Sequence, residues 1–195
     1  SSEHRDTPID LGDHYIEVPA KAPAQKRKFL GGILAQGKNG PLSVLCMDHD
    51  GEAYLRLDKA KYLIGILGVN EMVQVMTGSQ LHESKEALDL ALAVVRYMNL
   101  KCEALTERLG LTMVLEQTPA ESTAYRFAKL DLKSWPEAAS VVKGDPDSGE
   151  VYYTNSSHIP YSVPMDPADK VLGEGRFHPM ISAGAITHLW MGEHK

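Results

Sequence analysis

The sequence lacks most of the features that place a protein in a special class. It has only two cysteines, Cys46 and Cys102, whose unlike contexts suit neither a disulfide framework nor a zinc site. No hydrophobic run approaches the length of a membrane span, and the polar, acidic N-terminus does not resemble a secretory signal. The formal net charge of -6 argues against a protein that coats nucleic acid, although it leaves room for a single nucleotide. We therefore expect a cytoplasmic protein with reduced thiols and no membrane partner.

Familiar catalytic motifs are also missing. No serine-hydrolase elbow, P-loop or dinucleotide glycine fingerprint occurs. The 8 histidines include no pair with the H-x-x-x-H spacing of a helical metal site, so we expect no metal in this chain. Local motifs therefore do not name a reaction, and the order of the secondary-structure elements becomes the main source of information.

The first third of the chain predicts an arm followed by a helix and a hairpin. Residues 1–24 contain three prolines and are expected to be extended. A helix is predicted over 24–37, and strands over 41–47 and 52–57 flank the turn signal at 48–51.

From residue 62 onward, apolar strands alternate with helices, which predicts a parallel sheet covered by helices. Residues 62–69 form a continuous apolar run, typical of a strand buried on both faces. Asn70 and Ser84 are expected to cap two helices that Gly78 and Gly110 end. The remaining predicted elements are strand 111–117, a helix to about Leu132, loop 143–150, strand 151–159, a short helix at 166–175 and strand 184–192.

The stretch QTPAESTAYRF, residues 117–127, supports two interpretations. Thr118, Pro119 and Glu121 fit a capping box, which explains the helix start without a ligand. The same helix follows a buried strand, so its N–H groups open where α/β proteins bind anions, and Ser122, Thr123 and Arg126 could assist. The carboxylate of Glu121 opposes a phosphate there. Both interpretations stay open on physical grounds.

The stretch YYTNSSHI has polar side chains on both faces of its predicted strand. Tyr153, Asn155 and Ser157 would share one face, and Thr154, Ser156 and His158 the other. Such a segment either lines a site or leaves the core as a loop.

Several segments together resemble the anaerobic, class III, ribonucleoside-triphosphate reductases. The resemblance covers roughly residues 27–193 and includes LIGILGVNEMVQVMTG, LHESKEALDLALAVVRYMN, TPAESTAYRF, VYYTNSSHI and GRFHPMISAGAITHLW, in the family's order. It implies an α/β fold that forms the later strands and covering helices of a ten-stranded barrel of the glycyl radical type. Residues 1–60 would then be an arm, helix and hairpin packed on the barrel, and 61–195 the C-terminal part of the barrel.

The resemblance also implies a chemistry. In this family a radical-SAM activase installs a glycyl radical, which generates a cysteine thiyl radical that removes the 3′ hydrogen of a ribonucleoside triphosphate. Deoxyribonucleotides for DNA replication result. The carry-over assigns substrate binding to the following residues of this chain: Thr118, Ala120, Glu121, Ser122, Thr123, Arg126, Asn155 and His158.

The chemical half of that active site has no counterpart in these residues. Cys46 and Cys102 do not match the catalytic cysteines, and the family's radical glycine and structural zinc site fall outside the matching region. We therefore expect no cofactor in this chain, no turnover by it alone, and self-association through exposed strand edges. The alternative is a non-catalytic nucleotide-binding module, or a partner subunit of a split reductase.

Overall fold

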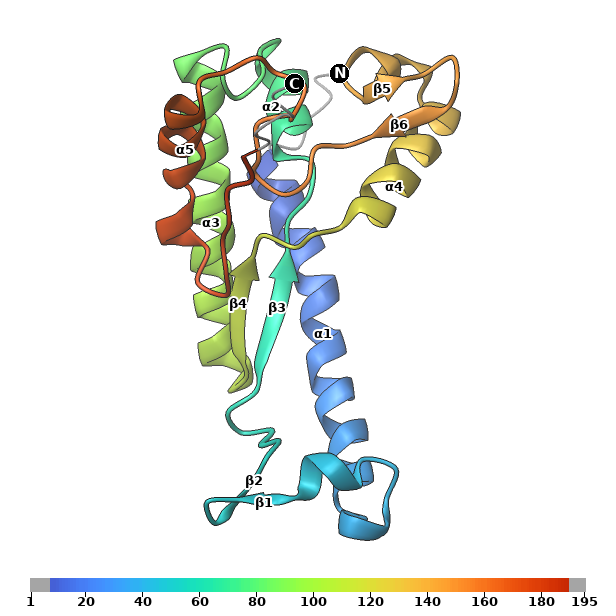
Figure 1. The fold of residues 1–195 in the computed structure, drawn as a ribbon, viewed down its shortest axis with the longest axis vertical. Helices are drawn as coiled ribbons and strands as arrows, with labels where there is room; N and C mark the ends of the chain where they lie inside the picture. The colour runs from blue at the N-terminus through green and yellow to red at the C-terminus, as the bar shows by residue number, and fades with distance from the viewer. Residues whose placement is uncertain (1–7, 190–195) are drawn as a thin grey trace, which may run out of the picture. The chain divides into compact units, whose positions relative to one another are not determined.

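A computed structural model describes residues 8–189 and divides the chain into two compact units. The first unit comprises Ser1–Ile64 and Met98–Val114, and the second comprises Gly65–Tyr97 and Leu115–Lys195. Both contain helices together with short strands, which confirms the expected α/β class (Figure 1).

The first unit begins with α1, a helix over Pro8–Leu34, so the extended arm expected over residues 1–24 is wrong from Pro8 onward. Pro8 occupies the first helical position, where its missing N–H costs nothing. Pro19 and Pro23 lie inside the helix and each removes a backbone donor. The intervening and following residues are mostly Ala, Lys and Gln, which favour helix strongly enough to continue it.

The strand predicted at 41–47 is absent, because this segment forms the 3-10 helix η2, Ser43–Cys46, after a first 3-10 turn η1 at Gly37–Asn39. The hairpin is therefore short. It joins β1, Asp48–His49, to β2, Glu52–Ala53, as an antiparallel pair. Asp50 and Gly51 both have positive φ values, 54° and 85°, as a tight hairpin turn requires, and this confirms the predicted turn.

Two hydrogen-bonded strands, β3 at Lys61–Gly65 and β4 at Thr112–Glu116, run in the same direction (Figure 1). The connection between them passes through α2, Val69–Thr77, and α3, Lys85–Leu109, as a parallel crossover demands. β3 is shorter than expected, and it is not buried on both faces because Leu63 is 52% exposed. β4 buries Met113, Val114 and Leu115.

The capping residues of α2 and α3 follow the sequence in part. Ser84 Oγ accepts a hydrogen bond from Ala87 N at 3.0 Å, and Gly78 and Gly110 end their helices with φ values of 77° and 61°. Asn70, however, is not the N-cap of α2. Gly68 takes that position in a left-handed conformation, φ 72°, and Asn70 is fully buried one residue inside the helix.

The buried stripe of α3 is lined partly by alanine. Ala87, Ala91 and Val95 are fully buried, and Cys102 and Leu105 nearly so, whereas Leu109 is partly exposed. Small side chains therefore make up part of the buried face of this helix.

The second unit continues with α4 and a hairpin. α4 spans Glu121–Ser134 and leads through η3, Pro136–Ser140, into β5, Lys143–Asp145, which pairs antiparallel with β6, Glu150–Tyr152. A loop was predicted here, and the turn residues at 146–149 instead close a hairpin too short to show alternation. α4 lies against β6 through a core of Ala128, Val142 and Val151 (Figure 1).

The final segments are α5, Pro167–Gly175, and the 3-10 helix η4, His178–Met180. α5 confirms the predicted short helix, and Asp166 Oδ1 caps it by accepting a hydrogen bond from Ala168 N at 2.8 Å. The strand predicted over 184–192 is wrong up to residue 189. Only Gly184 makes a parallel bridge, to Glu116, and residues 190–192 lie outside the described part of the chain.

Candidate functional site

The second unit contains a cavity with a volume of about 530 Å³. It lies where β4 ends and α4 begins. Its lining comes from residues 117–124, residues 152–161, Lys170 and the end of the described chain near Ile186. Parallel α/β structures bind ligands at such strand-to-helix connections.

The start of α4 differs from the predicted capping box. The helix begins at Glu121, and the residue before it, Ala120, provides no side-chain cap. Thr118 lies too early to be the cap, and its hydroxyl donates instead to Glu116 Oε2 at 2.7 Å. The first-turn N–H groups of α4 therefore have no acceptor within the helix and no capping side chain at Ala120.

Asn155 holds this helix start from a distant point in the sequence. Its Oδ1 accepts a hydrogen bond from Ala120 N at 3.1 Å, and its Nδ2 donates to Glu121 Oε1 at 3.4 Å. Both interactions join residues about 35 positions apart, so they fix the loop against the 152–158 segment.

The 151–159 segment does not keep the two faces that a strand would give it. β6 ends at Tyr152, and Ser156 has a positive φ of 48°, which reverses the chain direction locally. Asn155 and His158, predicted on opposite faces, consequently both line the cavity, while Ser156 and Ser157 are fully buried.

Gln117 connects two of the segments that line the cavity. Its Nε2 donates to Ser157 Oγ at 2.8 Å, and its Oε1 accepts from Ile186 N at 2.7 Å. Gln117 N also donates to Gly184 O at 3.1 Å. Sequence reasoning missed this residue, since a glutamine after a strand gives no signal until its distant partners are known.

A buried histidine–carboxylate pair forms another wall. His158 Nδ1 lies 3.0 Å from Glu174 Oε2, and Glu174 Oε1 accepts a hydrogen bond from Ile159 N at 3.0 Å. Lys170 Nζ is 3.8 Å from the same carboxylate. Burial alone would raise the pKa of Glu174, but His158, the Ile159 N–H and Lys170 together hold it below its usual value. Sequence reasoning missed Glu174, which lies on α5.

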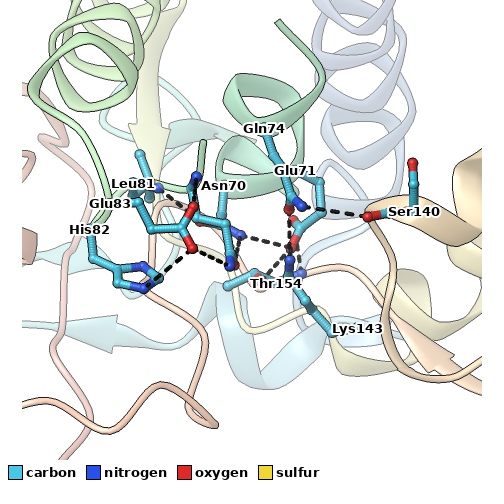
Figure 2. Close-up of polar contacts among 10 residues, drawn as sticks. Asn70, Glu71, Gln74, Leu81, His82, Glu83, Ser140, Lys143 and Thr154 are labelled. Atoms are coloured by element: carbon cyan, nitrogen blue, oxygen red, sulfur yellow. Dashed lines mark hydrogen bonds and ion pairs between the residues drawn. The ribbon is translucent and has the colours of Figure 1, made fainter. Parts of the chain in front are cut away.

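Behind the cavity, a polar network anchors Thr154 (Figure 2). The buried Glu71 carboxylate accepts hydrogen bonds from Thr154 N at 3.0 Å, Thr154 Oγ1 at 2.6 Å and Asn70 Nδ2 at 3.1 Å. Lys143 Nζ lies 3.8 Å from it and donates to Gln74 Oε1 at 2.8 Å. Burial lowers the pKa of Lys143, and the charges of Glu71 and Glu83 act in the opposite direction. Glu71 thus fixes the backbone next to Asn155.

Gly65 leaves room for the loop that follows β4. A Cβ atom at this position would lie 2.9 Å from Thr118 Cβ and would overlap its hydroxyl. The absence of a side chain in β3 therefore lets Thr118 pack directly on the strand.

The eight predicted substrate-binding residues fall into two groups. Thr118, Glu121, Asn155 and His158 line the cavity. Ala120 contributes its backbone to the Asn155 contact, Ser122 is exposed, Thr123 is half-buried, and Arg126 is exposed with its guanidinium 4.9 Å from the Phe127 ring centre. Their role in binding stays a prediction.

Two further observations concern residues 8–189. No helix there is long and apolar enough to cross a membrane. No group of three or more His, Cys, Asp or Glu side chains is placed to hold a metal ion in that range.

Comparisons with known proteins agree on one family. Residues 2–195 match the family model described as "Anaerobic ribonucleoside-triphosphate reductase". Relatives of that name from Salmonella typhimurium and Enterobacteria phage T4 are 27% and 29% identical over 142 and 132 residues, or 72% and 68% of this chain. In each case the match covers 19% of the relative, so the chain spans about a fifth of the length of these curated relatives.

Solved structures give the same fold. An anaerobic ribonucleotide reductase from Thermotoga maritima with dATP bound in the specificity site matches 93% of this chain and 29% of that one, at 20% identity and a TM-score of 0.72. Another structure described as an anaerobic ribonucleotide reductase matches 95% of this chain and 27% of that one, at 21% identity and a TM-score of 0.75. The chain therefore belongs to the anaerobic ribonucleoside-triphosphate reductase family.

Proposed function

We propose that this chain supplies part of the substrate-binding wall of an anaerobic ribonucleoside-triphosphate reductase. The cavity beside α4 would bind a ribonucleoside triphosphate, with the phosphates at the helix start. One observation supports this assignment above all: the cavity lies at a helix start that has no side-chain cap of its own.

In this proposal the N–H groups of Glu121, Ser122 and Thr123 donate to phosphate oxygens, and the helix dipole favours the negative charge. The Ser122 and Thr123 hydroxyls add donors, and Arg126 adds a positive charge one turn further along. Asn155 positions the loop by holding Ala120 N. It also holds the Glu121 carboxylate in a fixed direction. His158 lines the part of the cavity that the sugar would occupy.

The radical chemistry belongs, in this proposal, to the whole reductase. The family's glycyl radical, installed by a radical-SAM activase, would supply the hydrogen abstraction, while the residues described above bind and orient the nucleotide. The two cysteines support this division. Cys102 is buried within α3, and burial together with Glu103 raises its pKa to about 11, while Cys46 Sγ contacts Leu34 O at 3.5 Å. We therefore expect no deoxynucleotide from this polypeptide and its activase alone; a turnover assay that detects product would refute this.

A binding experiment tests the site. Replacing Ser122 and Thr123 by alanine together removes two hydroxyl donors to a charged acceptor, each contributing about 1.5–3 kcal/mol. We expect affinity for ribonucleoside triphosphates, measured by calorimetry with each of the four in turn, to fall at least about tenfold. Ser134→Ala, an exposed hydroxyl at the opposite end of α4, is the matched control. Equal affinities in the double variant and the control would leave the α4 start as an ordinary helix beginning.

We also propose that β3 and β4 belong to a ten-stranded barrel, and that the chain self-associates. The second unit exposes large apolar side chains that a folded barrel or a second copy would cover. They include Val75, Met76, Leu130, Trp135 and Leu172. Multi-angle light scattering at micromolar concentration should report a mass above the monomer. A clean monomer across the concentration range would contradict self-association.

A further inference from the structure

Glu174 and His158 form a second group of polar residues at the same cavity. We propose that Glu174 is a positioning residue, which fixes the His158 ring so that its Nε2 faces the cavity as a hydrogen-bond acceptor for a hydroxyl group of the ligand. The identification of that hydroxyl as a nucleoside sugar rests on the proposed function; the positioning itself does not.

Glu174 occupies a place that local structure disfavours. It lies in the last turn of α5, where the negative end of the helix dipole opposes a carboxylate. It is also fully buried, and a buried charge is costly unless it is paired and hydrogen-bonded. The carboxylate occupies this position despite two unfavourable effects, and its contacts show what offsets them.

Those contacts all support one wall of the cavity. Both oxygens are in use, Oε1 by Ile159 N and Oε2 by His158 Nδ1, each at 3.0 Å. Lys170, whose side chain is 14% exposed and which also lines the cavity, lies 3.8 Å from Oε1. The Glu174 carboxylate thus fixes both the ring of His158 and the backbone of Ile159.

The protonation of the His158–Glu174 pair determines whether Nε2 of His158 is a hydrogen-bond donor or an acceptor. The contacts around Glu174 hold its pKa below the usual value even though burial acts in the opposite direction, so the carboxylate is ionised and can only accept. Nδ1 of His158 must therefore be the donor. In the neutral ring this leaves a lone pair on Nε2, on the side of the ring away from the buried carboxylate.

The surroundings of the ring favour a hydroxyl over other ligand groups. The His158 side chain is 14% exposed and lines the cavity, and the His188 ring packs against it with centroids 5.7 Å apart at 65°. From α5, Glu174 contacts the ring and Lys170 lies beside that carboxylate at the same cavity. An Nε2 lone pair repels phosphate oxygens and accepts from a hydroxyl, so the phosphates belong at the α4 start and a sugar hydroxyl at His158.

The histidine tautomer can be measured without any ligand. Long-range ¹H–¹⁵N NMR on the ¹⁵N-histidine-labelled chain distinguishes a ring protonated at Nδ1 from one protonated at Nε2, and His158→Gln assigns the signal. At neutral pH we expect His158 with its proton on Nδ1, the minor form in free histidine. A ring protonated at Nε2 overturns the proposal, and the tautomer itself is read in the unmodified chain.

Variants then test the role of Glu174. Glu174→Gln should shift His158 toward a mixture of tautomers, whereas the control Asp169→Asn, an exposed carboxylate on the same helix, should leave the spectrum unchanged. Calorimetry adds a readout that a purely structural role would not move. Glu174→Gln should weaken binding of a ribonucleoside triphosphate about tenfold but leave binding of inorganic tripolyphosphate unchanged.

The outcomes separate the two proposals. Equal losses for both ligands, or an unchanged His158 spectrum in Glu174→Gln, overturn the positioning role. A wild-type chain that binds neither ligand but shows His158 protonated at Nδ1 overturns the nucleotide assignment while supporting the positioning of the ring.

Discussion

Replacing Glu71 by glutamine should destabilise the second unit strongly. The carboxylate is 3% exposed and accepts three hydrogen bonds, two from Thr154 and one from Asn70, with Lys143 nearby (Figure 2). The amide oxygen of a glutamine could still accept a hydrogen bond. Its NH₂ group could not, and it would face donor groups of Thr154 or Asn70. The substitution also removes from Lys143 the carboxylate that lies 3.8 Å from its Nζ.

The expected size follows from these losses. Removing one partner from a buried, hydrogen-bonded charge pair costs about 3–5 kcal/mol, a large part of the roughly 5–15 kcal/mol that stabilises a typical domain. Urea unfolding followed by tryptophan fluorescence should show the midpoint falling by about 1.5–2.5 M, if the slope is about 2 kcal/mol/M. The control Glu86→Gln removes the same charge from an exposed position on α3 and should change stability by less than about 0.5 kcal/mol.

A loss below about 1 kcal/mol in Glu71→Gln would refute the reasoning. It would mean that the hydrogen bonds around Glu71 rearrange, or that water replaces the lost acceptor. In either case Thr154 would not need the Glu71 carboxylate as a fixed partner.

Two further predictions concern titratable groups. Burial is the main cause that lowers the pKa of His82 from its usual 6.5, while the charge of Glu83 acts in the opposite direction. Below pH 6.5 His82 therefore binds a proton more readily in the unfolded chain than in the folded chain. The free energy of unfolding consequently falls as the pH drops from 6.5 through the pKa of the folded state. His82→Gln should reduce this loss, measured as the difference in urea midpoint between pH 7.5 and 5.5; an unchanged difference would exclude His82 as its source. Cys102 is 1% exposed and its pKa is raised to about 11, so a thiol reagent at pH 8 should modify Cys46 much faster. Equal rates in the native chain would show that α3 opens readily.

Local signals predicted the elements whose ends are set by their own residues. Ser84 and Gly110 bound α3 because a hydroxyl cap and a left-handed glycine act within one turn. The same signals failed where tertiary contacts decide. Asn70 looked like a cap, but it is buried and its Oδ1 accepts from Leu81 N at 3.1 Å, so Gly68 begins the helix instead.

In the candidate site, too, the features set by local sequence could be predicted and those set by tertiary contacts could not. The position of the α4 start after a strand could be predicted, because strand and helix are adjacent in sequence. The partners that complete the cavity could not, since Asn155 is 35 residues from Ala120 and Glu174 is 16 residues from His158 along the chain. An acidic residue in the last turn of a short helix was the available signal for Glu174, because it breaks the local electrostatic preference.

The close approach of Thr118 to Gly65 has a consequence for the evolution of this fold. Because a side chain at Gly65 would occupy the space of Thr118, the two positions share one volume. Substitutions there should be coupled across homologous sequences, with a larger residue at the glycine appearing only where the threonine position has become smaller. A glycine in β3 would thus restrict which loops can follow β4 beside the cavity.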